Sequence, residues 1–299
     1  MHLTQESRKT NTTVQGNMFE NMFENSGNAR ANDCARHPCF SESLNQYARI
    51  HLPVAPACNI QCRYCLRKYC CANECRPGVT ARVMTPVEAL DWYLSQKKQF
   101  PEITVAGVAG PGDALANWPV VKETLRKIRA VDPEVYLCLS TNGLLLPEYA
   151  EELRESGVRF VTVTVNCVDV ECGAQLYAFV NYRDARYTGL EAAKLLFHQQ
   201  VEGIRAVKKL GMFIKINCVA IDGINMDQIE KVANLAEALQ CDVMNIIPLL
   251  PVPGSELEKE KPPSCEQIEQ LRLTCGKKIR QMKHCNHCRA DAVGRLKGK

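Results

Sequence analysis

Short apolar runs alternate with longer amphipathic stretches from about residue 48 onward, and this alternation constrains the fold more than any other feature of the sequence. The expected strands cover 48–54, 103–109, 135–140, 160–165, 213–221 and 243–247. The expected helices cover 86–99, 118–130, 147–156, 189–210, 225–239 and 265–283. Strands that alternate with amphipathic helices predict an α/β fold with a parallel sheet and right-handed crossovers, and six such units make a partial (βα)6, TIM-like barrel. Ligands bind at the carboxyl ends of strands in such sheets, so we expect the chemistry in the loops that follow them.

Length and composition narrow the class of protein. With 299 residues, of which 46% are apolar, the chain can bury one large core. Seventeen cysteines without an export signal indicate a reducing cytoplasm and metal ligation rather than disulfides. No apolar run approaches the ~20 residues that cross a bilayer. A net charge of +4 without long basic blocks gives no indication of a nucleic-acid partner.

The composition also divides the chain into segments. Residues 1–33 are polar and rich in Asn, Thr and Glu, which predicts a flexible tail because they offer little apolar surface to pack. Residues 34–47 form an N-terminal extension, and 48–254 form the barrel. Residues 255–299 form a C-terminal extension with a helix and a cysteine pair. We expect the two extensions to cover the mouth of the barrel.

Three cysteines follow the first expected strand at the spacing C-x3-C-x2-C, namely Cys58, Cys62 and Cys65. Three thiolates can hold three irons of a [4Fe–4S] cube and leave the fourth iron open to a small molecule. A zinc site fits the spacing poorly, because zinc prefers C-x2-C pairs that complete four ligands. A disulfide framework is not needed in so long a chain. With the aromatic Tyr64 before the last cysteine, the segment resembles the radical S-adenosylmethionine (SAM) enzymes.

Glycine-containing and polar segments follow the next strands, where a SAM molecule would lie. Glycines let the backbone approach a ligand closely, and hydroxyl and amide side chains can bond its ribose and carboxylate. Read alone, such segments are also ordinary turns. Thr162, Thr164 and Asn166 share one face of a strand by its period of two. The residues expected to contact SAM are Gly110, Gly112, Asp113, Ser140, Thr141, Asn142, Thr164, Asn166 and, as an apolar wall for adenine, Ile247.

The remaining cysteines include further candidates for metal ligation. Cys285 and Cys288 form a C-x2-C pair that needs ligands from elsewhere, and a zinc knuckle is the alternative. The group most similar in kind is Cys70, Cys71 and Cys75. Taken singly, Cys39, Cys138 and His51 are as well explained as buried or hydrogen-bonded residues. Seven cysteines show no ligand spacing and are expected to be structural: Cys34, Cys167, Cys172, Cys218, Cys241, Cys265 and Cys275.

A denser resemblance covers residues 37–294. The matching strings are HPCF at 37–40, VAPACNIQC at 54–62, ANECRPGV at 72–79, AGPGD at 109–113, STNG at 140–143, NCVD at 166–169 and HCNHCRADAVG at 284–294. In these strings the chain resembles the nitrogenase cofactor biosynthesis family, NifB. Many bacterial members carry a further C-terminal carrier domain, and this chain resembles the short, stand-alone form typical of methanogenic archaea.

The resemblance implies three [4Fe–4S] clusters as well as SAM. The first cluster would bind SAM, and the other two would be substrates held in the barrel. Cys70 and Cys75 remain open as alternatives to Cys71. The implied ligand sets are Cys58, Cys62 and Cys65 for the first cluster, Cys39, His51 and Cys138 for the second, and Cys71, Cys285 and Cys288 for the third.

The reaction implied by the family is the fusion of the two substrate clusters into an eight-iron, carbide-centred core. One SAM donates its methyl group to a cluster sulfide, and a second yields a 5′-deoxyadenosyl radical. Glu74 and Arg76 are candidates for positioning or proton transfer, with a surface ion pair as the alternative. The implied partners are iron–sulfur donor proteins, an electron donor such as ferredoxin, and downstream cofactor carriers or scaffolds, with no membrane. Two other functions stay open: a radical SAM maturase with auxiliary clusters, and a non-catalytic iron–sulfur scaffold.

Overall fold

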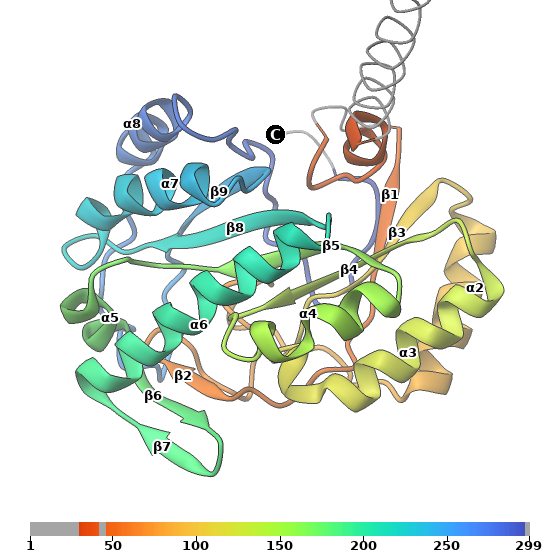
Figure 1. Cartoon of the computed structure of the whole chain (residues 1–299), viewed down its shortest axis with the longest axis horizontal. Coiled ribbons are helices and arrows are strands. Elements are labelled where there is room, and N and C mark those ends of the chain that lie inside the picture. The colour runs from red at the N-terminus through yellow and green to blue at the C-terminus, as the bar shows by residue number, and fades with distance from the viewer. Residues whose placement is uncertain (1–29, 42–45, 297–299) are drawn as a thin grey trace, which may run out of the picture.

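The computed structural model describes residues 30–41 and 46–296, so the expected tail from 1 to 29 lies outside the described residues. Within this part of the chain, one sheet has the strand order β10-β1-β3-β4-β5-β8-β9 (Figure 1). Its parallel strands are β1 (Ala48–His51), β3 (Ile103–Val108), β4 (Tyr136–Thr141), β5 (Val158–Thr164), β8 (Phe213–Ala220) and β9 (Val243–Pro248). The predicted partial barrel is therefore confirmed.

Helices connect the parallel strands and pack on the outer face of the sheet (Figure 1). They are α2 (Pro86–Gln99), α3 (Trp118–Val131), α4 (Leu146–Glu155), α6 (Gly189–Lys209) and α7 (Ile229–Ala238). A further helix, α8 (Cys265–Cys275), follows the last parallel strand. Helix α2 begins with a capping box, in which the Thr85 side chain accepts from the Glu88 N–H and Glu88 accepts from the Thr85 N–H. Short 3₁₀ turns precede two of the helices, at Leu115–Asn117 and Met226–Gln228.

The prediction of a helix through residue 283 is wrong, because α8 ends at Cys275. Residues 280–282 are instead extended beside β9, where the Met244 N–H donates to Arg280 O and the Met282 N–H donates to Met244 O. The sequence pattern also does not predict five short elements. These are α5 (Val170–Leu176), β2 (Ile60–Cys62), β6 (Tyr177–Tyr182), β7 (Ala185–Tyr187) and β10 (Val293–Gly294).

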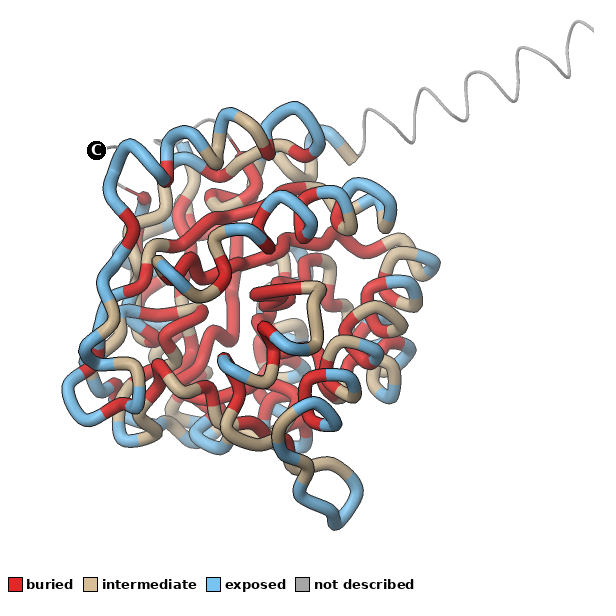
Figure 2. Tube along the Cα trace, turned by 90° about the vertical axis from the view of Figure 1, so that its left-hand side faces the viewer, coloured by how far each residue is buried: buried red, intermediate tan, exposed pale blue. Residues whose placement is uncertain are grey.

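Side chains alternate strictly between the two faces of the parallel strands. The outer face is apolar and packs under the helices, so the buried residues in Figure 2 gather inside a shell of exposed helix surface. The inner face is largely polar, although it is buried. Its polar residues are Arg49, His51, Cys138, Ser140, Thr162, Thr164, Lys215, Asn217 and Asn245. A polar interior of this kind needs partners, and a polar ligand can supply them.

The amino end of the barrel is closed by an aromatic cluster of Phe40, Phe160 and Phe213. The Phe160 ring lies 4.8 Å from the rings of both Phe40 and Phe213. Along β5 the inward side chains then proceed from Phe160 to Thr162 and Thr164, which line cavities further along the barrel. The chain segment that contributes Phe40 therefore places its neighbour Cys39 at the floor of the interior.

The C-terminal segment closes the side of the barrel that the parallel strands leave open. At one edge Gln281 bridges to Met244 of β9. At the other edge β10 pairs antiparallel with β1, and the His51 N–H donates to Ala292 O at 2.8 Å. Residues 282–292 cross from one edge to the other, so Cys285 and Cys288 face the interior from the side opposite β4 and β5.

The folded part of the chain begins before the expected boundary at residue 34, because residues 30–35 are helical. Asp33 accepts hydrogen bonds from the Tyr136 hydroxyl at 2.8 Å and from the Arg159 guanidinium at 2.7 Å. Of the helices that the structure describes, none combines the length and apolar character needed to cross a bilayer.

The contact between α4 and α6 yields a test of the fold. A β-carbon at Gly203 would lie 2.6 Å from Leu146 Cβ, so Gly203→Ala should lower the free energy of unfolding by about 1–3 kcal/mol. The better helix propensity of alanine, about 1 kcal/mol, acts in the opposite direction. Urea denaturation measures the difference. Arg205→Ala, on an exposed position of the same helix, is the control and should stay within about 0.5 kcal/mol. A stabilised Gly203→Ala protein would contradict this packing.

Candidate functional site

A small cavity with an empty volume of about 360 Å³ lies at the carboxyl ends of the strands. The three cysteines of the C-x3-C-x2-C loop line it together, as the sequence predicts. The rest of the lining comes from the loops after β3 and β4, from β5, and from residues 71–74 of the segment that follows the cysteine loop.

The cysteine loop is held by a three-stranded sheet, β2-β6-β7, that lies apart from the barrel strands (Figure 1). Ile60 pairs with Val180 and Cys62 with Tyr177. The Asn181 N–H also donates to Asn59 O at 2.8 Å. The backbone of the loop is therefore fixed by a hairpin more than a hundred residues away in sequence, and the side chains of the three cysteines are left to face the cavity.

Each sulfur of the cysteine loop has its own N–H donor, and the three donors come from three different segments. The pairs are Asn142 Nδ2 with Cys58 Sγ (3.8 Å), Asn73 Nδ2 with Cys62 Sγ (3.9 Å) and Arg67 Nη1 with Cys65 Sγ (3.8 Å). Donors of this kind stabilise thiolates. Burial, and next the charge of Asp113, raise the pKa of Cys58 to about 12, so without a metal the neutral thiol is favoured. This donor set fits a metal cluster that takes three thiolates.

In the described part of the chain, no three His, Cys, Asp or Glu side chains lie close enough to hold a single metal ion. A cube does not require such a group, because its ligands are spread over separate iron corners. The three thiols around one cavity are therefore consistent with a cluster, whereas a preformed zinc site is not present among these residues.

Asp113 organises the other side of the small cavity. Its carboxylate accepts hydrogen bonds from the Asn142 N–H at 2.6 Å and from the Thr141 hydroxyl at 3.0 Å, and also from the Leu115 N–H. Burial raises its pKa, although the four donors, the Ala116 N–H among them, act in the opposite direction. Asp113 therefore ties the β3 loop to the β4 loop, which in turn aims Asn142 at Cys58.

Gly112 allows the β3 loop to lie directly on the cysteine loop. Its N–H donates to Ala55 O at 2.5 Å, and a β-carbon at this position would overlap the Ala57 carbonyl group. The close approach of the two backbones explains why glycine is found here.

Six of the residues expected to contact SAM line the small cavity: Gly112, Asp113, Ser140, Thr141, Asn142 and Thr164. Three do not line it. The side chain of Asn166 is held by the hydroxyls of Tyr64 and Tyr177, to which it donates at 2.6 and 3.2 Å. Ile247 lines a different cavity, and Gly110 lies against the Cys75 thiol. For these three residues, the structure gives a packing role.

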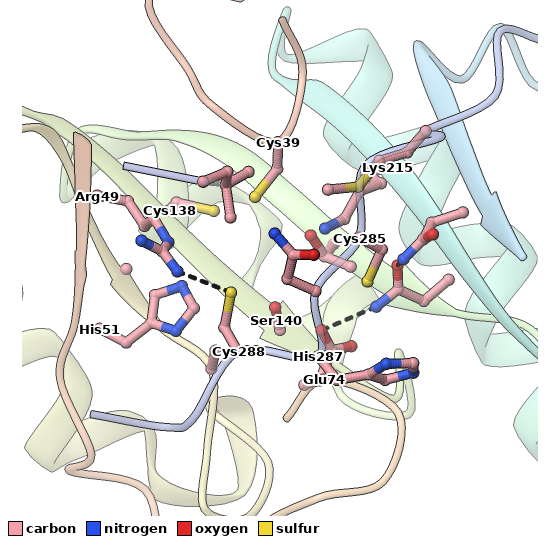
Figure 3. Close-up of a pocket in the computed structure, with 18 of the residues that line it drawn as sticks. Cys39, Arg49, His51, Glu74, Cys138, Ser140, Lys215, Cys285, His287 and Cys288 are labelled. Atoms are coloured by element: carbon pink, nitrogen blue, oxygen red, sulfur yellow. Dashed lines mark hydrogen bonds between the residues drawn. The ribbon is translucent and has the colours of Figure 1, made fainter. Parts of the chain in front are cut away.

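A second, larger cavity with a volume of about 700 Å³ adjoins the small one, with which it shares lining residues. Figure 3 shows the side chains around it. Five of the six side chains expected to bind the substrate clusters line it. They come from the N-terminal extension, β1, β4 and the C-terminal segment: Cys39, His51, Cys138, Cys285 and Cys288. Segments separated by up to about 250 residues therefore meet around one enclosed space.

His51 is held in the form that binds a metal. Burial, and next the charge of Arg49, lower its pKa to about 3, so the imidazole is neutral. Its Nδ1 lies 3.1 Å from Arg289 O, and since a carbonyl only accepts, Nδ1 carries the proton. Nε2 therefore keeps a free electron pair, which is the arrangement of a histidine ligand whose other nitrogen is fixed by an outer carbonyl.

Arg49, which lies on β1 with His51, orients the thiol of Cys288. Its guanidinium donates to Cys288 Sγ at 2.8 Å (Figure 3) and to the Gly294 carbonyl. These two contacts fix the Cys288 sulfur at the wall of the large cavity.

Three residues line both cavities, namely Asn73, Glu74 and Ser140. Glu74 accepts hydrogen bonds from the Thr164 hydroxyl at 3.0 Å and from Asn217 Nδ2 at 3.0 Å. Burial raises the pKa of Glu74 to about 7, while the charge of Lys215 lowers it. A carboxyl group that exchanges its proton near neutral pH therefore forms part of the wall between the cavities.

The structure does not bring Cys71 into the large cavity with Cys285 and Cys288. Its side chain lines the small cavity, because the 71–75 turn, closed by the Cys75 N–H donating to Cys71 O, orients it there.

The other candidates in this segment lie outside both cavities. The Cys75 thiol donates to Ala109 O, and Cys70 packs beside Cys75, so both cysteines belong to the hydrophobic packing. Arg76 is exposed and lines neither cavity, and its backbone N–H donates to Cys288 O. The expected role of its side chain in the site is therefore not supported.

Several residues of the large cavity were not identified as candidates from the sequence. The period of two that marks Thr162 and Thr164 also marks these, because they alternate with apolar neighbours in β1, β8 and β9. They are Arg49, Lys215, Asn217 and Asn245. His37 also lines this cavity, and its position in the HPCF string is the signal that could have identified it.

The chain matches the family model of the radical SAM superfamily over residues 52–236. It is 43% identical over 265 residues to the FeMo cofactor biosynthesis protein NifB of Bradyrhizobium diazoefficiens, a match that covers 87% of this chain and 53% of that protein. It is 42% identical over 259 residues to the protein of the same name from Chlorobaculum tepidum, covering 86% of this chain and 61% of that protein. The chain thus spans little more than half the length of these curated relatives.

Solved structures resemble the fold at low sequence identity. The FeFe-hydrogenase maturase HydG from Carboxydothermus hydrogenoformans matches with a TM-score of 0.55 and 14% identity, covering 75% of this chain and 50% of that one. Methylornithine synthase (PylB) matches with a TM-score of 0.52 and 14% identity, covering 82% of this chain and 75% of that one. At these identities the likeness shows the fold alone.

The raised pKa of Glu74 yields a test in the cluster-free protein. Because the folded pKa of about 7 lies above the value of 4.5 expected in the unfolded chain, folding takes up a proton between these pH values. The contribution of Glu74 to stability is complete below pH 4.5 and is lost as the pH rises through 7. From pH 4.5 to 8, wild type should lose about 3 kcal/mol relative to Glu74→Gln in urea denaturation. Exposed Glu151→Gln is the control and should follow wild type. A pH-independent difference between wild type and Glu74→Gln would contradict the assignment.

Proposed function

Because the chain belongs to the radical SAM superfamily and is a homologue of the NifB proteins, we propose that it acts in the biosynthesis of the FeMo cofactor. In this proposal it fuses two [4Fe–4S] substrate clusters into an eight-iron precursor with a central carbide, and SAM supplies the carbon and the radical. The observation that carries the proposal is the pair of adjoining cavities. One is lined by the three-cysteine loop, and the other by cysteines and a histidine from four separate segments.

The small cavity is the proposed site of SAM cleavage. Cys58, Cys62 and Cys65 would hold the resident cluster, and their three N–H donors would stabilise its thiolate ligands. When bound, a [4Fe–4S] cluster with one open iron supplies a place for SAM and the electron that cleaves it. Asp113 and Asn142 would fix the cavity wall against which SAM lies.

The large cavity is the proposed site of the two substrate clusters. Cys39, His51 and Cys138 would bind one, and Cys285 and Cys288 would bind the other together with Cys71. Clusters that must merge and leave cannot be locked by four thiolates each, so a small ligand set fits the reaction. A histidine is suited to release, because its bond to iron competes with a proton.

Cys71 is the ligand whose role needs its own test, because it lines the small cavity in this structure. We propose that it binds the same substrate cluster as Cys285 and Cys288. In this proposal it reaches that cluster from the side of the small cavity, where SAM would lie. Cys71→Ala should lower the iron content of the reconstituted protein, while Cys70→Ala and Cys75→Ala should not.

Glu74 is the proposed proton acceptor for the hydrogens lost from the SAM-derived methyl group. It lines both cavities, and its pKa of about 7 lets it accept and release a proton near neutral pH. The proposed partners follow from the reaction. They are a protein that donates iron–sulfur clusters, an electron donor such as ferredoxin, and a carrier or scaffold that receives the precursor.

Two cysteine variants test the proposed division of labour between the cavities. Cys58→Ala should abolish reductive cleavage of SAM, because it removes a ligand of the resident cluster. Cys285→Ala should lower the iron content from about twelve per chain while leaving a cluster that still cleaves SAM. Anaerobic iron and sulfide analysis, with detection of 5′-deoxyadenosine and S-adenosylhomocysteine, measures both effects.

Cys265→Ala is the matched control, since Cys265 is exposed and lines neither of these cavities. It should keep wild-type iron and SAM cleavage. Full iron and full cleavage in both test variants would refute the ligand assignment. An iron-loaded wild type that forms neither SAM product would instead indicate a passive scaffold.

A further inference from the structure

Lys215 is a buried cation that lacks a partner within the described part of the chain. It lies on β8 between Phe213 and Asn217, on the inner face of the strand, and its side chain lines the large cavity (Figure 3). The residue is 8% exposed. Among the residues that the structure describes, its ammonium makes no hydrogen bond and no ion pair.

The other buried cation of this cavity shows what is unusual about Lys215. Arg49 is 6% exposed, but its two terminal nitrogens donate to two backbone carbonyls and to Cys288 Sγ, and its Nε alone lacks a partner among the described residues. A buried charge without such partners is costly, and proteins normally pair it or neutralise it. An ammonium left without a partner at the wall of a cavity therefore indicates that an anion fills the space beside it.

The acidic groups nearest to Lys215 belong to both proposed substrate sites and to the shared wall: Cys39, Glu74, Cys285 and Cys138. In Figure 3 the side chain of Lys215 extends into the space between Cys39 and Cys285.

A second donor without an acceptor lines the same cavity. The Cys39 N–H donates to His37 Nδ1 at 3.1 Å, so the proton of this neutral imidazole lies on Nε2. His37 Nε2 is buried and has no hydrogen-bond partner among the described residues. Two donors that lack acceptors, from different elements, both line the cavity to which Cys39 contributes its thiol.

We propose that Lys215 is a substrate-binding residue, whose ammonium donates hydrogen bonds to the inorganic sulfides of the two [4Fe–4S] clusters and holds these anions together in the large cavity. His37 Nε2 is the second donor, on the side of the cluster bound by Cys39. This inference rests on the proposed function, because it takes the substrate clusters as the anions.

The chemistry of lysine suits this task. The sulfides of both clusters carry negative charge and repel one another when the clusters lie side by side, most strongly in a buried site of low dielectric constant. A compact ammonium has three donors and a full positive charge, so it can bond sulfides of both clusters at once and screen their repulsion. It forms no bond to iron, so it does not oppose fusion of the clusters or release of the product.

The test compares Lys215→Met, which keeps length and packing but removes the charge, with Lys215→Arg, which keeps the charge. Lys122→Met is the control, because Lys122 lies in an exposed ion pair on α3. All are made both in the otherwise unchanged chain and in a Cys58→Ala, Cys62→Ala, Cys65→Ala background, where the remaining iron reports the substrate clusters. The readouts are the rate of iron loss to a chelator after anaerobic reconstitution, the melting temperature of the cluster-free protein, and 5′-deoxyadenosine formation in the otherwise unchanged chain.

In the background without the first cluster, Lys215→Met should lose iron about ten- to a hundredfold faster than its parent, and Lys215→Arg should largely restore the slow loss. The cluster-free Lys215→Met protein should melt at a higher temperature than wild type, because an unpaired buried charge has been removed. If Lys215 had only a structural role, the Lys215→Met substitution would instead lower the melting temperature. Lys122→Met should match its parent throughout, 5′-deoxyadenosine formation included.

Iron loss from Lys215→Met at the parental rate, or a lowered melting temperature without its clusters, would overturn the inference. A background protein that takes up no iron would overturn it together with the proposed substrate sites. A wild type that retains its substrate clusters but forms no eight-iron product on addition of SAM would refute the proposed fusion. In that case the charge-dependent retention by Lys215 would still support its role in holding the clusters.

Discussion

The burial of polar and charged side chains on the inner face of the barrel is the constraint on which the rest of the structure depends. A strand exposes alternate side chains to opposite faces, so an apolar outer face under the helices leaves the inner face free to differ. Here that face carries Arg49, His51 and Lys215. The side chain of Glu74, which comes from a loop, lines the same cavity. Such groups are costly to bury unless they are paired. Asp113 and Arg49 make several hydrogen bonds within the protein, whereas Lys215 makes none among the described residues, and this difference separates the groups that build the cavities from the one that we propose binds a ligand.

Closure of the barrel depends on the two ends of the described chain rather than on the barrel strands. Phe40 anchors the N-terminal extension in the aromatic cluster and places Cys39 at the floor. Pairing with β9 and with β1 draws residues 282–292 across the open side of the sheet. Both extensions are fixed mainly by backbone pairing and apolar contacts, to which the Cys288 thiol adds a hydrogen bond from Arg49.

The order of strands and helices could be predicted from the sequence, because the apolar periods of two and 3.6 are set by the same burial that forms the sheet and helices. The small cavity was also predictable, since the loops after β1, β3 and β4 must meet at one edge of a parallel sheet. The meeting of Cys39, Cys138 and Cys285 was not predictable from spacing, because it depends on how the extensions cross the barrel, and here the family resemblance supplied the grouping. The end of α8 at Cys275 was missed because pairing of residues 280–282 with β9 overrides helix propensity. Cys71 was grouped by resemblance with a cavity that its turn does not face in this structure.

The wall between the cavities also bears on the proposed function, in which SAM cleavage and cluster fusion share one barrel. Asn73 donates to Cys62 Sγ on one side, while its carbonyl oxygen accepts from Asn217 Nδ2 on the other. Glu74 is bonded to Asn217 as well, so the wall is tied to β8 two residues from Lys215. A change of charge in either cavity therefore acts on the same short network of hydrogen bonds, and at this depth it is weakly screened. In the proposed function, this network would keep the resident site rigid, and the floor of the barrel, with its few ligands and its unpaired ammonium, would take up and release the substrate clusters.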